Sequence, residues 1–520
     1  MKDMAQLIPI FILIAFSIAI LVLQRREINL AQIWMTSVIG AIIAWLSILF
    51  IFLLQNLELT VPYLITTDGN KNSLTFLMEQ SNWIFEFLLL TLFVSSLFID
   101  AGQLTREKII LTWSGRMLIS ALGLAVILSG STLTFLISSA ILDLFLFGFE
   151  QINKAEGRKS VLDLCIRLTG SLLIIFGESL GSELNAFLML LGVSLRIGLS
   201  KALFSDPFDL ISRHKADQFL DMILPLSSLA YIKQMGGVET GFWGKDLLVI
   251  IISLSVLLTS VSFIRNLKTG YVVGLWVKAF SGIVILALIS GITAAILPIA
   301  IVMCVWGGML SLESIRSVKL KIVILVLMLA MIGLPYTPTA GLWITNKLGI
   351  ASVLTLLINL FVLLLLITGF RKFLFLLETN QQQDGWINFS MGVGPLFLLV
   401  MPWANLLLGE KMGINIVNVW WAGVFLLGVT FILLFDRNSK FRNLLLPAFT
   451  KINPILRLLK IALHFLSFKW LRPFLRIIQD VISDLIRLFN RAFEGDGGLL
   501  WAILFLILIS SILVTYRLII

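Results

Sequence analysis

Apolar runs of about twenty residues recur along the whole chain, and short stretches with charged residues, glycine or proline separate them. A run of this length crosses a hydrocarbon core of roughly 30 Å as a helix, and only helices or closed barrels satisfy the backbone there. The pattern therefore predicts an all-α polytopic membrane protein with about sixteen transmembrane helices. The expected spans are 7–23, 33–54, 83–99, 109–128, 133–149, 161–176, 184–204, 219–232, 247–264, 271–289, 292–309, 322–334, 348–370, 391–408, 417–435 and 499–514.

Composition points the same way. The 520 residues are 59% hydrophobic and 13% charged, whereas about a quarter of an ordinary globular chain is charged. A water-facing surface cannot be built from this chain, so the lipid bilayer is its solvent. The two cysteines, Cys165 and Cys304, lie in apolar runs, and the two histidines are far apart, so we expect no disulfide framework, metal site, haem or other cofactor.

The net charge of +10 is a topology signal, and we expect no nucleic-acid partner. Basic residues concentrate in the loops after odd-numbered spans, as Arg25, Arg26, Arg106 and Lys108 illustrate. Because basic loops stay on the cytoplasmic side, both termini are expected in the periplasm of a bacterial cell with this chain in its inner membrane. The first run lacks a small-residue cleavage site before Gln24, so it is expected to be a span rather than a signal peptide.

Residues 436–496 break the pattern, because basic residues alternate there with Leu, Ile, Phe and Trp. A polar stripe on an otherwise apolar helix is typical of a helix that lies along the membrane surface. The expected organisation is a bundle of about fifteen spans over 1–435, a lateral amphipathic helix over 436–496 and a final span within 497–520. The lateral helix is either an ordinary interfacial anchor or a brace; about fifty residues would reach roughly 75 Å, far enough to contact a neighbouring subunit.

Charged residues inside the spans are the first candidates for function. A charge in hydrocarbon costs at least a few kcal/mol, so these side chains should face the bundle interior, water or each other. They would form either a path for protons or ions, or isolated pairs that hold helices together, such as Asp163 with Arg167 one turn later. The residues are Arg116, Asp143, Asp163, Arg167, Glu178, Arg196, Lys201, Asp221, Lys233 and Lys278.

The stretch GLPYTPTAG, 333–341, is the second candidate. It places Gly333, Pro335, Pro338 and Gly341 at the end of an apolar run, and a helix cannot continue through it unbroken. A broken helix at membrane depth frees backbone groups for ions or water. The plainer interpretation is a loop between two spans.

These features resemble the antiporter-like subunits of bacterial respiratory complex I, nearest the L subunit, and the related Mrp-type cation/proton antiporter subunits. The likeness rests on the span number, the periplasmic termini, the lateral helix and GLPYTPTAG followed by Lys347. RIGLSKALFSDPFD (196–209), RNLKTGYVVGL (265–275) and LLLITGFRKFLF (364–375) resemble further family segments. The family's broken helix carries its lysine four residues after the second glycine; here Thr345 holds that place, and Lys347 follows two residues later.

The resemblance implies two inverted five-helix repeats, around the fourth to eighth and ninth to thirteenth spans, with a polar axis at mid-membrane. It makes Arg196 the counterpart of the family's membrane lysine and Asp143 its counter-charge, one turn after Ser138 and Ser139 at the family's Trp-Glu position. Pro225 stands at the titratable position of the eighth span. The expected proton or ion path comprises Asp143, Arg196, Lys201, Asp221, Lys233, Lys278 and Lys347.

Three functions remain open from the sequence. The chain is a proton- or cation-translocating subunit, a non-conducting scaffold subunit with the same fold, or an independent secondary transporter or flippase. The first two require other membrane subunits as partners, besides the lipid bilayer. No catalytic site is expected in the chain itself, so an activity such as NADH:quinone oxidoreduction would belong to the whole assembly.

Overall fold

A computed structural model gives the arrangement of most of the chain. It describes residues 4–26, 29–53, 57–61, 74–103, 109–152, 157–180, 182–199, 219–234, 244–265, 272–310, 325, 328, 330–334, 337, 339, 341–343, 353–376, 385–403 and 416–437. The chain divides into two compact units, Met1–Arg457 and Leu458–Ile520, and all described residues belong to the first. The expected lateral helix and final span lie outside the described residues, so the boundaries at 435 and 496 stay predictions.

The all-α fold is confirmed: the described residues form fourteen α-helices, seven of them long and apolar enough to cross a membrane. Each expected span from 7–23 to 292–309, and those at 348–370, 391–408 and 417–435, corresponds to one helix. The span expected at 322–334 is described only in part. The helices are α1 Ile8–Arg25, α2 Leu30–Phe52, α3 Gln80–Ile99, α4 Ile109–Ile127, α5 Thr132–Ile152, α6 Gly157–Ser179, α7 Ser182–Ile197, α9 Leu220–Gln234, α10 Lys245–Arg265, α11 Val273–Ile289, α12 Ile296–Leu310, α14 Val353–Leu376, α15 Gly385–Val400 and α17 Ile416–Arg437.

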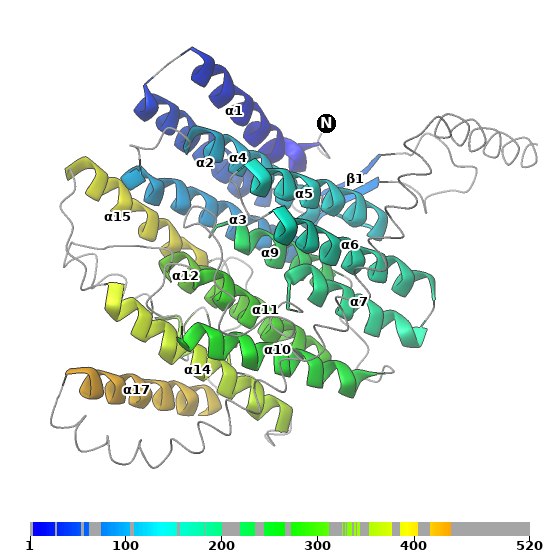
Figure 1. Ribbon diagram of the computed structural model, residues 1–520, viewed down its shortest axis with the longest axis vertical. Helices are drawn as coiled ribbons and strands as arrows, with labels where there is room; N and C mark the ends of the chain where they lie inside the picture. The colour runs from blue at the N-terminus through cyan, green and yellow to red at the C-terminus, as the bar shows by residue number, and fades with distance from the viewer. Residues whose placement is uncertain are drawn as a thin grey trace, which may run out of the picture. The chain divides into compact units, whose positions relative to one another are not determined.

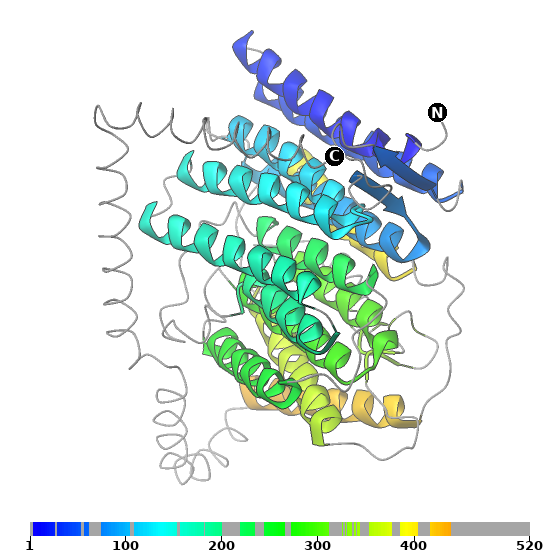
Figure 2. The same cartoon turned by 90° about the vertical axis from the view of Figure 1, so that its right-hand side faces the viewer.

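The helices lie side by side, and segments far apart in sequence are neighbours (Figures 1 and 2). Helix α15 runs along α3, and a Cβ on Gly394 would stand 2.9 Å from the backbone oxygen of Ser95. The window Asn82–Ile99 of α3 is 83% buried, whereas that of α1 is 28% buried. Helix α3 is therefore an inner helix, and α1 presents most of its apolar surface to lipid.

The segment between the second and third expected spans contains a β-hairpin. Strands β1 Leu57–Val61 and β2 Leu74–Met78 pair antiparallel, with Leu57 opposite Met78. Strand β2 also bonds the turn between α4 and α5: Leu77 N donates to Leu128 O at 2.7 Å, and Gly130 N to Thr75 O at 2.7 Å. Strand β1, LELTV, alternates apolar and polar residues, but β2, LTFLM, does not, so the sequence offered no matching pair of strands.

Helices α6 and α7 pack through two glycines. A Cβ on Gly170 would stand 2.5 Å from Gly192 O, and a Cβ on Gly192 would stand 2.5 Å from Gly170 O. Backbones approach this closely in membranes only where residues are small. This contact fixes the relative position of the two helices that carry Arg167 and Arg196.

Gly170→Ala is therefore expected to lower the free energy of unfolding by about 1–3 kcal/mol, because the methyl group forces the two backbones apart. Thermal unfolding of the purified protein in mild detergent measures this. The matched control is Gly148→Ala in α5, where a Cβ meets no atom within 4 Å, so its stability should be unchanged or slightly higher. Equal stability of both variants and the natural protein would contradict the close α6–α7 packing.

Candidate functional site

Helix α7 ends in the interior of the bundle instead of continuing to residue 204 as expected. Gly198 N donates to Leu195 O at 3.0 Å and Leu199 N to Ser194 O at 3.1 Å, with Gly198 at φ 82°. This is a Schellman termination, which requires a left-handed residue that glycine adopts without steric cost. Arg196 thus lies in the last turn, where the negative end of the helix dipole favours a cation.

Arg196 and Arg167 share the carboxylate of Asp143. Arg196 Nη1 donates to Asp143 Oδ2 at 2.9 Å, and Arg167 Nε lies 3.8 Å from Asp143 Oδ1. Arg196 Nη1 also donates to Ser171 Oγ, and its guanidinium lies 5.5 Å from the ring centroid of Phe135. The side chains of Arg196 and Asp143 are 1% and 0% exposed. These four polar residues, Asp143, Arg167, Ser171 and Arg196, form a buried arginine cluster with one excess positive charge.

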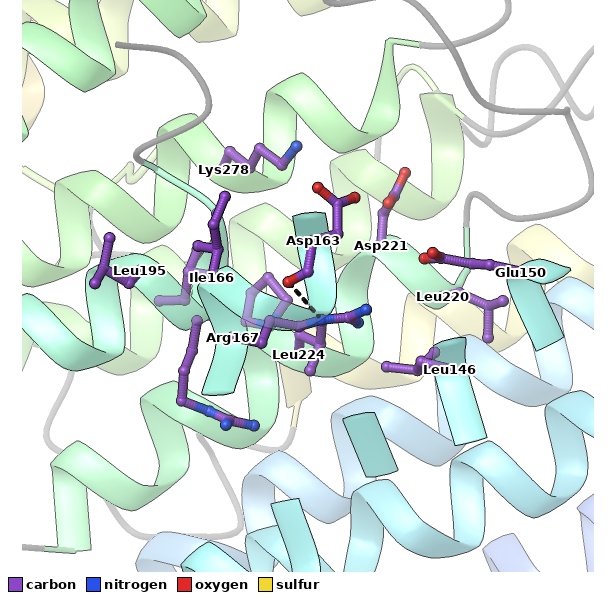
Figure 3. Close-up of a pocket in the computed structure, with 14 residues that line it drawn as sticks. Leu146, Glu150, Asp163, Ile166, Arg167, Leu195, Leu220, Asp221, Leu224 and Lys278 are labelled. Atoms are coloured by element: carbon purple, nitrogen blue, oxygen red, sulfur yellow. Dashed lines mark hydrogen bonds between the residues drawn. The ribbon is translucent and has the colours of Figure 1, made fainter. Parts of the chain in front are cut away.

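A small cavity of about 40 Å³ adjoins this cluster (Figure 3). A buried water needs roughly 10–15 Å³ of such space, so about three waters fit. Figure 3 shows Asp163, Asp221 and Lys278 around one space, with Glu150 at its side. The lining residues are Leu146, Glu150, Asp163, Ile166, Arg167, Leu195, Arg196, Ile197, Gly198, Leu220, Asp221, Leu224, Pro225 and Lys278.

Asp221 and Lys278 come from α9 and α11 and approach the cavity from neighbouring helices. A Cβ on Gly274 would stand 2.6 Å from Asp221 Oδ2, so the carboxylate of Asp221 lies directly against α11. Lys278 is one turn after Gly274 on the same helix face. The cavity therefore combines side chains that exchange protons with guanidinium groups that stay charged at neutral pH.

Four of the expected path residues meet in this one place: Asp143, Arg196, Asp221 and Lys278. Lys233 lies in the last turn of α9 and is not among the lining residues. Lys201, Lys347, Pro335 and Pro338 lie outside the described residues. Whether the four carry ions stays a prediction.

Two further expected residues, Gly333 and Gly341, lie in described non-helical backbone. Gly333 has φ 80°, and its N–H donates to Thr339 Oγ1 at 3.2 Å. Trp343 Nε1 donates to Ile332 O at 2.8 Å, so a side chain satisfies a carbonyl at this point of the chain. The described part of GLPYTPTAG thus folds on itself through side-chain hydrogen bonds.

Sequence reasoning paired Arg167 with the wrong residue. Its Nε donates to the backbone oxygen of Asp163 at 3.3 Å, but its ion pair is with Asp143 on another helix. Arg116 likewise pairs with Asp100, which follows α3 at the start of a 3₁₀ turn, Asp100–Gln103. The sequence also missed Glu86, whose signal was a single acidic residue within the apolar run of the third span.

No protein-family model and no curated protein matches the sequence. Solved structures do. A chain of respiratory complex I from Thermus thermophilus with bound NADH matches with TM-score 0.58 and 14% identity, over 82% of this chain and 100% of that one. This chain shares the fold of a chain of respiratory complex I.

Two more structures agree. The Thermus thermophilus complex I with bound aureothin has a chain with TM-score 0.54 and 16% identity, over 77% of this chain and 98% of that one. The membrane-bound sulfane sulfur reductase, an archaeal respiratory membrane complex, has a chain with TM-score 0.60 and 14% identity, over 98% of this chain and 99% of that one. The fold that the sequence predicted, that of a membrane chain of complex I, is thereby confirmed. The chain is a multi-pass membrane protein.

Proposed function

We propose that this chain is a membrane subunit of a respiratory-type complex and that it translocates protons or a monovalent cation. The fold shared with chains of two kinds of respiratory complex supports the assembly. The loop charges support an orientation with both termini in the periplasm, which makes the starts of α9 and α11 cytoplasmic. The other membrane subunits of that complex are its partners.

The observation that carries the transport proposal is the cavity beside the arginine cluster. Its titratable side chains, Asp163, Asp221, Glu150 and Lys278, take up and release the ion, and its waters connect them. Arg196 and Arg167 do not release protons at neutral pH. They act as fixed positive charges, which set the potential at the inner end of the cavity.

The size of the cavity excludes an organic substrate at this site. Drug-sized ligands occupy pockets of about 300–1,000 Å³, whereas this cavity measures about 40 Å³. Water, protons and small cations fit. The scaffold function differs in one respect: it requires only the ion pairs and gives the cavity side chains no role.

Asp221→Asn and Lys278→Met are each expected to reduce ion flux at least about tenfold, since each removes a group that exchanges protons or binds a cation. Flux is measured in liposomes that hold the isolated complex under an imposed membrane potential, with and without sodium to identify the ion. The control is Lys245→Met, because Lys245 starts α10 and is not among the lining residues. Normal flux in both cavity variants would favour the scaffold.

A further inference from the structure

Five buried polar atoms on α3 and α9 have no hydrogen-bond partner within the described part of the chain. Three of them, Asn82 Oδ1, Glu86 Oε1 and Ser228 Oγ, belong to residues that are almost fully enclosed. The three residues are 0%, 1% and 1% exposed. Buried polar groups are almost always satisfied, and an unsatisfied group in a native fold calls for a water, an ion or a functional explanation.

Asn82 and Glu86 lie on the face of α3 that meets α9, and the two helices run antiparallel. Phe93 of α3 meets Phe219 at the start of α9, with ring centroids 5.3 Å apart. One turn further, Leu89 and Ile223 both approach Gly123, whose added Cβ would stand 3.2 and 2.9 Å from them. Glu86 and Asn82 continue the face of Phe93 and Leu89 at helical spacing, whereas Ser228 lies about half a turn around α9 from Phe219, on the side of the cavity.

Helix α9 lies between Glu86 and the cavity, with Phe219 toward α3 and Asp221 toward the cavity. Pro225 lines the cavity, and Ser228 follows three residues later on the adjoining turn. A proline inside a helix has no N–H, so the carbonyl of Asp221 loses its helical donor and can accept from water. On the other side of Glu86, Asn82 stands one turn nearer the beginning of α3, where its Nδ2 donates to Leu77 O at 3.1 Å.

Helices α11 and α12 carry no carboxylate. Lys278 is the one charged residue of α11, α12 has none, and every residue of α12 is buried. The stacked rings of Trp276 and Trp306, with centroids 5.5 Å apart, lie between these two helices. The buried polar atom without a partner on α12, Trp306 Nε1, is a donor only and cannot hold a proton in transit.

Glu86 is suited to hold a proton. An ionised carboxylate without a partner in an apolar interior costs several kcal/mol, and neutralisation by a proton removes that cost. A single water between Glu86 and Asn82, one turn apart on α3, would satisfy the remaining lone pairs. Asp143 differs because two guanidinium groups compensate its charge.

We propose that Glu86 is a second proton-binding site, separate from the arginine cluster, and that it passes protons along α3 toward Asn82, at the end of the membrane where α3 begins. The proton-binding part stands on burial and geometry. The transfer part rests on the proposed function and makes the transported ion a proton.

A lipophilic carbodiimide applied to membranes that contain the intact complex tests the binding part. The carboxylic acid adds across a C=N bond of the reagent: the proton goes to nitrogen, the carboxyl oxygen bonds the central carbon, and the adduct rearranges to a stable acylurea. We expect peptide mass spectrometry to find one reagent molecule on Glu86. Glu86→Gln should lose this label, whereas Asp221→Asn should keep it. An unlabelled Glu86 in the natural protein would overturn the proposal.

Ion flux tests the transfer part. Glu86→Gln is expected to reduce proton flux at least about tenfold, and Glu86→Asp should restore part of it because the acid is retained. If Glu86 is labelled but Glu86→Gln conducts normally, the transfer role fails while the proposed function stands. If Asp221→Asn and Lys278→Met also conduct normally, the proposed function itself fails.

Discussion

Asp143→Asn is expected to lower the free energy of unfolding by about 3–5 kcal/mol, because it removes one partner of a buried ion pair and leaves uncompensated charge behind. In this protein the loss is compounded, since Arg167 and Arg196 would face each other without the carboxylate between them. Thermal unfolding in mild detergent, compared with the natural protein, measures the change. We expect a large drop in Tm and a low yield of folded protein.

A second variant separates charge from packing. Adding Arg167→Gln to Asp143→Asn removes one of the two guanidinium groups, so the double variant should be more stable than Asp143→Asn alone. Arg167 is the better choice because it lies 3.8 Å from the carboxylate, whereas Arg196 lies at 2.9 Å. If Asp143→Asn alone were as stable as the natural protein, the cluster would not depend on Asp143 for its charge balance.

Arg196→Lys is expected to raise proton flux at least about tenfold, because it replaces a permanently charged guanidinium by an ammonium group that can release its proton. The lysine side chain is also shorter and loses the planar contacts with Ser171 and Phe135. It should therefore bind Asp143 less rigidly. Flux in liposomes that hold the isolated complex is the measurement.

The control is Arg116→Lys, which makes the same exchange in the ion pair with Asp100. Arg116 is not among the residues that line the cavity, so its replacement should leave flux unchanged. Arg196→Lys with the flux of the natural protein would show that Arg196 does not limit translocation. A rise in both variants would point to a general leak.

The helices were predictable because the requirement to satisfy the backbone in lipid imposes long apolar runs. The end of α7 could not be predicted from the sequence. Gly198 is one of many glycines in the spans, and only the backbone geometry shows its left-handed conformation. The ion-pair partners of the buried charged residues were equally unpredictable from the sequence. Spacing along one helix suggested Asp163 for Arg167, whereas packing of α5 against α6 brings Asp143 to it.

The enclosure of α3 has a consequence for biosynthesis. Its polar residues, Asn82 and Glu86, enter the membrane with the third span, but α15, which covers another side of α3, begins only at Gly385. At about 5–20 residues per second, synthesis of the intervening chain takes roughly fifteen seconds to a minute. During that time the side of α3 that α15 later covers, at Ser95 and Ile99, must be shielded by lipid, by the insertion machinery or by a helper protein.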